Sequence, residues 1–92
     1  MKTQDFLHHL ARGIDSYTAR AGLTIIAGRH GWWVNNTYNA NETYVYEVGN
    51  SAGKFVYVQI RDAMYHAWER GGAAVSLNDE AQLEAWLTTN LG

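Results

Sequence analysis

The chain has 92 residues, which is enough for one hydrophobic core and excludes a second, so we expect a single domain over residues 1–92. Apolar residues make up 47% of the chain and charged residues 17%, a composition typical of a globular protein and not of a disordered one. Cysteine is absent, which excludes disulfides and zinc–thiolate sites, and a net charge of −2 gives no general attraction to nucleic acid. Because no apolar run approaches membrane-spanning length, a cytoplasmic protein with no membrane partner is expected.

The first element predicted along the chain is a helix over residues 3–22. Thr3 can cap its start, and Gly22 is a natural stop. Apolar side chains recur at spacings of four, four and three, which places them on one stripe. These residues are Phe6, Leu10, Ile14 and Tyr17.

The next stretch, LTIIAGRHGWWVNN from Leu23, has β-branched and aromatic residues on both sides of a Gly-Arg-His-Gly turn, which predicts a β-hairpin. A polar loop is expected at residues 35–41. Alternation along the hairpin then assigns each side chain to one face of a sheet. The inner face receives Leu23, Ile25, Trp32 and Val34, and the outer face receives Ile26 and Trp33.

A second hairpin is predicted in ETYVYEVGNSAGKFVYVQIRD, residues 42–62, around its Gly-Asn-Ser-Ala-Gly turn. Two pairings of its strands are possible. If Tyr46 lies opposite Tyr57, the carboxylate of Glu47 falls among valines, where an unpaired charge is costly. If Tyr46 lies opposite Val56, the clearly polar side chains share one face, and this pairing is preferred. The inner face then carries Tyr44, Tyr46, Val48, Val56, Val58 and Ile60, and the outer face carries Thr43, Val45, Glu47, Phe55, Tyr57 and Gln59.

The last third of the chain contains one ambiguous and one clear segment. In DAMYHAWERGG, Asp62 can cap a short helix with Met64, Tyr65 and Trp68 inward, although the segment also alternates as a strand; helix is preferred. SLNDEAQLEAWLTTNLG predicts a helix, with Ser76 or Asn78 as the cap and an apolar face of Leu83, Trp86 and Leu87. The predicted fold is therefore α+β, a four-stranded antiparallel meander sheet with an N-terminal helix and C-terminal helices.

On this fold, five large apolar side chains would lie on the outer face of the sheet. Two interpretations stay open: the face is an interaction surface, or the C-terminal helix or the segment from Met64 to Trp68 covers it. The residues concerned are Ile26, Trp33, Val45, Phe55 and Tyr57.

No chemical signature indicates catalysis. The histidines His8, His9, His30 and His66 lack a metal-ligand spacing, so no metal site is expected. The serines fall in a helix, a turn and a cap, and GNSAGK is too short for a phosphate-binding loop. We expect a protein that is not an enzyme and has no cofactor, with a small hydrolytic enzyme as an alternative.

Nucleic-acid binding was considered for GKFVYVQI, where a lysine precedes alternating aromatic residues, as in the strand of RNA recognition motifs. The internal glycines of that motif are missing. Lys54 and Arg61 are also too few to replace the general phosphate attraction that the negative net charge removes. Direct nucleic-acid binding is therefore not favoured.

The ending SLNDEAQLEAWL, together with the small size and the helix-plus-meander plan, resembles the small phage-encoded anti-CRISPR proteins. The resemblance implies a noncatalytic inhibitor or adaptor that binds a protein or ribonucleoprotein complex, such as a CRISPR effector whose access to DNA it blocks. A homodimeric structural or regulatory protein is the alternative, and the chain is expected to be a monomer or a homodimer.

Two groups of residues are candidates for binding such a partner. Trp33, Phe55 and Tyr57 are rigid aromatic anchors of the kind that dominate interfaces. Asp79, Glu80 and Glu84 could engage a basic groove, although the first two are equally explained by the preference of a helix start for acids.

Overall fold

Residues 16–37 and 44–92 are described by the structure, a computed structural model, and they form two helices and a five-stranded sheet. In chain order the elements are α2 (Ser16–His30), β1 (Trp33–Thr37), β2 (Tyr44–Gly49), β3 (Phe55–Arg61), β4 (Met64–Glu69), β5 (Val75–Leu77) and α3 (Glu80–Leu91). All strands pair antiparallel with their neighbours in the order β1-β2-β3-β4-β5. The α+β class and the antiparallel sheet are confirmed, with five strands instead of the predicted four.

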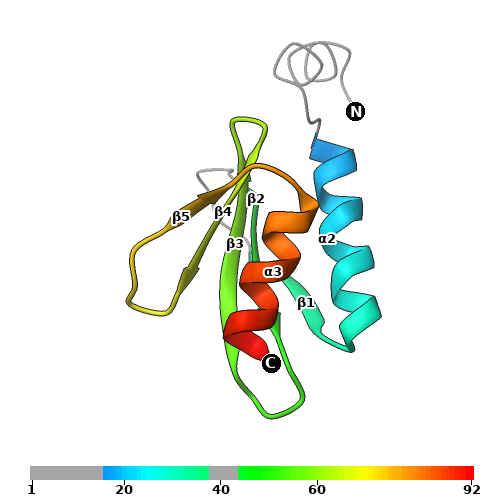
Figure 1. The fold of residues 1–92 in the computed structure, drawn as a ribbon, viewed down its shortest axis with the longest axis vertical. Helices are drawn as coiled ribbons and strands as arrows, with labels where there is room; N and C mark the ends of the chain where they lie inside the picture. Colours follow the sequence, from blue (N-terminus) through cyan, green and yellow to red (C-terminus); the bar gives the residue numbers. More distant parts are fainter. Residues whose placement is uncertain (1–15, 38–43) are drawn as a thin grey trace.

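The core lies between one face of the sheet, called the inner face, and the two helices, which pack beside each other over it (Figure 1). Alternate residues of the central strands point into this layer and are almost completely buried, as period-two patterning requires. The sheet contributes Tyr46, Val48, Val56, Val58, Ile60, Tyr65, Ala67 and Leu77, and the helices contribute Ala19, Leu23, Ile26, Ala27, Leu83, Leu87 and Leu91.

Helix α2 corrects the prediction for residues 23–30, which are helical and not the first strand of a hairpin. The predicted helix start at Thr3 lies outside the described residues. The predicted stop at Gly22 is wrong, because the helix continues through it to His30. Burial follows the helical period, so Ile26 is 3% exposed and Ile25 is 60% exposed, the reverse of the strand assignment.

Gly22 has a packing role in place of the predicted helix stop. A Cβ at this position would lie 2.8 Å from Cγ of Glu80 in α3 and 3.0 Å from the hydroxyl of Tyr65. The missing side chain therefore lets the first turn of α3 approach the middle of α2. Glycine destabilises a helix interior by about 1 kcal/mol relative to alanine, and the close packing of the two helices at this position offsets that loss.

Helix α2 ends at His30, within the Gly-Arg-His-Gly sequence that was predicted to be a hairpin turn. Gly31 has φ 75°, the left-handed conformation that follows a helix C-terminus. The amide of Trp32 donates to the carbonyl of Ala27 at 2.9 Å, and the amide of Gly31 donates to Gly28 at 3.3 Å. This is the Schellman pattern, and it turns the chain directly into β1.

The hairpin of β2 and β3 was predicted in the correct region but with a register shifted by two residues. Tyr46 pairs with Val58, not with Val56, and Val48 pairs with Val56. A shift of two leaves every side chain on its predicted face, so Tyr46 is buried as expected. The prediction for Tyr44 concerns a side chain outside the described part of the structure.

The register is set by Asn50, which closes the turn after β2. Its side-chain oxygen accepts hydrogen bonds from the amides of Ala52 (3.0 Å) and Lys54 (3.1 Å). The backbone amide of Asn50 donates to the carbonyl of Lys54 at 2.9 Å. The turn therefore occupies only residues 50–54, and the strands pair right up to Gly49 and Phe55.

Residues 64–69 form strand β4, so the preferred prediction of a helix at 62–70 is wrong and the alternating-strand alternative is correct. Asp62 does not cap a helix. Asp62 and Ala63 both adopt left-handed φ values, 57° and 61°, as the two central residues of a tight hairpin turn do. Tyr65 points inward as predicted, whereas Met64 and Trp68 lie on the opposite face.

Helix α3 is confirmed, with a different cap from the two that were predicted. Ser76 lies in β5, and the N-cap is Asp79, whose carboxylate accepts from the amide of Gln82 at 2.9 Å. Leu83 and Leu87 are fully buried, and Trp86 is partly buried against the same core. The predicted apolar face is therefore the face that packs on the sheet.

Candidate functional site

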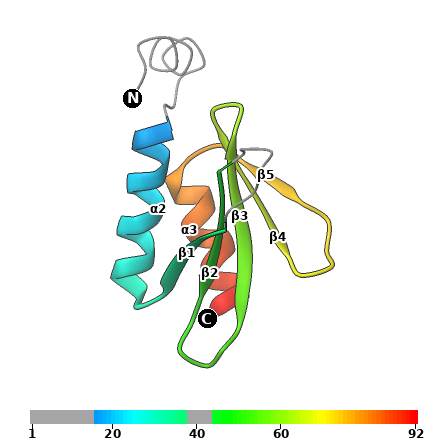
Figure 2. The same cartoon turned by 180° about the vertical axis from the view of Figure 1, so that it is seen from behind.

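The side of the sheet opposite the helices, called the outer face, carries the side chains that alternate with the core residues. Seen from this side, the strands lie in front of α3, and neither α2 nor α3 crosses them (Figure 2). Of the two segments that could have covered this face, α3 packs on the inner face and residues 64–68 belong to β4. Its described side chains include Trp33, Asn35, Val45, Glu47, Phe55, Tyr57, Gln59, Met64, His66 and Trp68.

Four aromatic rings form a continuous row across this face, called the aromatic row: Trp33, Phe55, Tyr57 and Trp68. The ring centroids of Trp33 and Phe55 are 6.0 Å apart. Phe55 meets Tyr57 edge to face at 5.6 Å, and Tyr57 stacks on Trp68 at 5.5 Å with an interplanar angle of 19°. These separations are those of favourable aromatic pairs, so the rings hold each other in place.

Gly49 in β2 makes this row possible. The indole of Trp33 lies across this glycine, and a Cβ at position 49 would overlap the indole ring. The Trp33 Nε1–H also donates to the carbonyl of Asn50 at 3.2 Å. The indole of Trp33 is thus held by Gly49 and by the Asn50 carbonyl, while the residue remains 37% exposed.

The other three rings are half-buried, so their edges and part of their faces remain accessible. A row of this kind loses little side-chain entropy when a second surface covers it, because its members are already ordered. The structure therefore brings together the three predicted anchors Trp33, Phe55 and Tyr57, and it adds Trp68. Ile26, which was expected on this face, is in the core instead.

Polar groups border the row along the sheet. The Ser76 hydroxyl lies 3.4 Å from Nδ1 of His66, and Nε2 of His66 lies 3.2 Å from the carbonyl of Arg61. The Arg61 guanidinium pairs with the exposed Asp62 carboxylate at 3.1 Å, which neutralises its charge. Glu47 lies within the face itself, paired across the strands with Asn35 on one side and Tyr57 on the other.

The three acids predicted to form a second binding group have separate roles within the fold. Asp79 caps α3, as described above. The carboxylate of Glu80 approaches the Tyr65 hydroxyl at 3.5 Å, and that hydroxyl donates to the carbonyl of Ala19 at 2.9 Å. Burial, followed by the charge of Glu80, raises the pKa of the Tyr65 phenol far above its ordinary value, so it stays a hydrogen-bond donor.

Glu84 joins the two helices by an ion-pair cluster. Its carboxylate accepts two hydrogen bonds from Nη1 of Arg29, both at 2.9 Å, and lies 2.6 Å from Nε2 of His30. The hydrogen bonds from His30 and then Arg29 lower the pKa of the Glu84 carboxyl. His30 in turn stacks on Trp32 at 4.3 Å. The charge of Glu84 therefore stabilises the contact between α3 and the end of α2.

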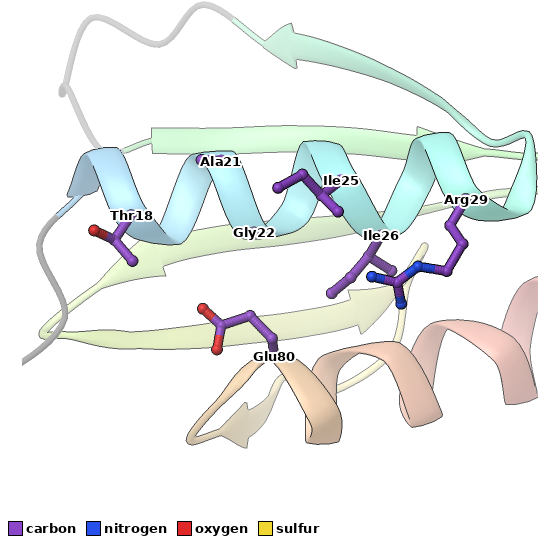
Figure 3. A pocket seen from close by; sticks show the side chains of 7 residues that line it. All are labelled: Thr18, Ala21, Gly22, Ile25, Ile26, Arg29 and Glu80. Carbon is purple, nitrogen blue, oxygen red and sulfur yellow. The ribbon is translucent and has the colours of Figure 1, made fainter.

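A shallow groove of about 420 Å³ lies between α2 and the first turn of α3 (Figure 3). Its lining is mainly apolar. Glu80 reaches into it from α3, and Arg29 borders it from the last turn of α2; both are engaged by protein partners. The lining residues are Thr18, Ala21, Gly22, Ile25, Ile26, Arg29 and Glu80.

Within residues 16–37 and 44–92, no three histidine or acidic side chains converge as a metal site would need. His30 and His66, two of the four histidines considered as ligands, lie on different elements with the partners given above; His8 and His9 fall outside the described residues. In the same part of the chain, neither helix is long and apolar enough to span a bilayer.

Trp68 and Glu47 are the members of this site that the sequence interpretation did not single out. Trp68 was placed in a helix, although the alternation of MYHAWE already signalled that it would share a face with the aromatic residues of β3. Glu47 was correctly placed on the outer face, but only as a polar residue that must avoid the core.

No protein-family model matches the chain, and comparisons with curated proteins and with solved structures gave no significant match.

Proposed function

We propose that this protein is a noncatalytic binding protein that attaches to a protein or ribonucleoprotein partner through its outer face, with the aromatic row as the anchor. The observation that carries the proposal is the row itself: four contiguous, mutually packed rings on a sheet face that neither described helix covers. Contiguous apolar side chains left accessible on one face of a protein often mark an interaction surface.

The character of the row supports a protein partner more than a nucleic acid. Bases stack on ring faces that are free, whereas Tyr57 and Trp68 each have one face covered by the other ring, which leaves less area for stacking on bases. The basic Arg61 beside the row is paired with Asp62, and the exposed Lys54 and Arg70 lie at one end of the row, so its middle has little attraction for phosphate. Ordered aromatic side chains are the groups that most often supply the binding energy of protein interfaces.

The acidic residues are given no part in this surface. The carboxylate of Glu84 is already bound by Arg29 and His30, and that of Asp79 caps α3. A basic group of a partner would therefore compete with contacts that hold the helices.

The most specific form of the proposal names a CRISPR effector complex, and it rests only on the resemblance in size, helix-plus-meander plan and closing segment. Addition of the purified protein to such a complex tests it, with reduced binding of target DNA as the expected result. The binding function through the aromatic row does not depend on that outcome.

The experiment that tests the proposal is affinity capture from host extract with three versions of the chain. The wild type should retain a partner, and the double variant Trp33→Ala/Tyr57→Ala should lose it while keeping its circular dichroism spectrum. Ile25→Ala is the matched control, because it removes an exposed apolar side chain on α2, away from the outer face. A partner retained equally by all three versions would contradict the proposal.

Pairing of two copies through the same outer face is the alternative use of the row. Sedimentation equilibrium distinguishes it: a concentration-dependent mass that the double variant abolishes would assign the row to a homodimer.

A further inference from the structure

The outer face carries the carboxylate of Glu47, on β2, beside the aromatic row. Glu47 lies directly opposite Tyr57 in the pairing of β2 with β3, which sets their Cβ atoms about 5 Å apart. The side chain is half-buried, and within residues 16–37 and 44–92 its carboxylate has no hydrogen bond or ion pair. A charge held in this position, without a partner in the described structure, is available to a ligand.

The order of the strands determines what lies on each side of the Tyr57 ring. Trp68, on β4, stacks on one side of it, and Glu47, on β2, lies on the other. The π-face of Tyr57 that turns toward β2 therefore lies on the side of Glu47. An aromatic face is negative at its centre, so ring and carboxylate both attract a cation.

The charges around this position agree with a cationic ligand. Arg61 is paired with Asp62, and His66 contacts Ser76 and the Arg61 carbonyl. Lys54 and Arg70 are exposed just beyond the ends of β3 and β4, at the end of the row where Phe55 lies. The middle of the face therefore presents a negative group between apolar rings.

We propose that the partner places an arginine side chain between the Glu47 carboxylate and the Tyr57 ring, so that the outer face recognises a basic residue flanked by apolar ones. This deepens the proposed function and rests on it. A guanidinium suits the position better than an ammonium, because it is planar, stacks on an aromatic ring and donates two parallel hydrogen bonds to one carboxylate. A phosphate backbone is disfavoured, because Glu47 repels it.

The test uses a defined probe and the full chain. The probe is a capped tripeptide with arginine between two leucines; its matched control has citrulline, which keeps the shape but lacks the charge. Binding is followed by the nitrogen-15 indole signals of Trp33 and Trp68. The arginine peptide should shift these signals at lower concentration than the citrulline peptide.

The variant Glu47→Gln should weaken binding of the arginine peptide by about three- to tenfold, down to the level of the citrulline peptide. Glu69→Gln is the control, because it removes an exposed acid at the end of β4 that pairs with Val56, on the other face. Its affinity should equal that of the wild type. Equal responses to the two peptides, no response to either, or an unchanged affinity in Glu47→Gln would each overturn the proposal.

A single-stranded oligonucleotide is titrated in parallel. If it shifts the same indole signals more strongly than the arginine peptide, the face recognises nucleic acid and the arginine proposal fails. The failures are separable, because loss of a captured partner in Trp33→Ala/Tyr57→Ala with full retention in Glu47→Gln would keep the proposed function and remove only the arginine contact.

Discussion

The two faces of this sheet are both rich in large apolar side chains, but they use them differently. On the inner face, aliphatic residues such as Val56 and Val58 interlock with the helices and are fully buried. On the outer face, the rings pack along the sheet against one another and stay partly exposed. Burial against helices stabilises the fold, whereas a row of rings packed only on its neighbours leaves contact area for a second molecule.

The largest expected effect on the free energy of unfolding comes from removing a buried side chain that packs on the inner face. Leu83→Ala removes a fully buried side chain of α3 and should lower the free energy of unfolding by about 3 kcal/mol. Tyr57→Ala, on the outer face, should lower it by only about 1 kcal/mol, because the lost contacts are with adjacent rings. Urea unfolding monitored by circular dichroism measures both. Equal losses would show that the two faces contribute alike to stability.

The second prediction concerns two glycines of the same helix. Gly22→Ala places a methyl group 2.8 Å from Cγ of Glu80 and should destabilise the protein by about 1–3 kcal/mol. Gly28→Ala meets nothing within 4 Å and should stabilise it by about 0.5–1 kcal/mol through helix propensity. Melting temperatures of the two variants should therefore move in opposite directions. A shift of the same sign would contradict the close approach of the helices.

The third prediction tests the turn between β3 and β4, because this turn makes residues 64–69 a strand and so places Trp68 on the outer face. Ala63 has φ 61°, which costs a residue with a Cβ about 1–2 kcal/mol. Ala63→Gly should stabilise the hairpin by about 1 kcal/mol, and thermal unfolding detects this. A loss of stability would be evidence for a helix at residues 62–70, because glycine weakens helices.

The smallest effect is the dependence on pH of the cluster that joins the helices. The pKa of Glu84 is lowered in the folded protein from its ordinary value of 4.5, so its contribution is complete above that value and is lost as pH falls through the folded pKa. Wild type should therefore lose stability in acid below about pH 4.5 more steeply than Glu84→Gln. Parallel pH-dependent denaturation curves for the two proteins would contradict the pairing of Glu84 with His30 and Arg29.

The faces of the β2–β3 hairpin could be predicted because alternation survives a register error of two residues. Glu47 had to face away from the valines, and this correctly placed Phe55 and Tyr57 beside it. The position of Trp33 on the outer face was also correct, although the hairpin assumed around it was wrong.

Helix α2 could not be predicted beyond Gly22, because Thr24, Ile25, Ile26 and Gly28 all have low helix propensity. Tertiary packing of Leu23 and Ala27 holds that half of the helix. Trp68 was missed because its segment fits both an alternating strand and a short helix. The strand is favoured by the left-handed turn at Asp62 and Ala63, and neither residue type is a strong sequence signal for such a turn. The pairing of Glu84 with residues 54 and 55 positions earlier required the fold itself.

The four tryptophans test most directly whether the outer face is open in the full chain. Trp33 and Trp68 lie on the outer face, and Trp32 and Trp86 lie with the core. A soluble nitroxide added to the nitrogen-15-labelled protein should broaden the indole signals of Trp33 and Trp68 strongly and that of the buried Trp32 weakly. If Trp33 and Trp68 are as protected as Trp32, the aromatic row is covered and is not a free binding surface.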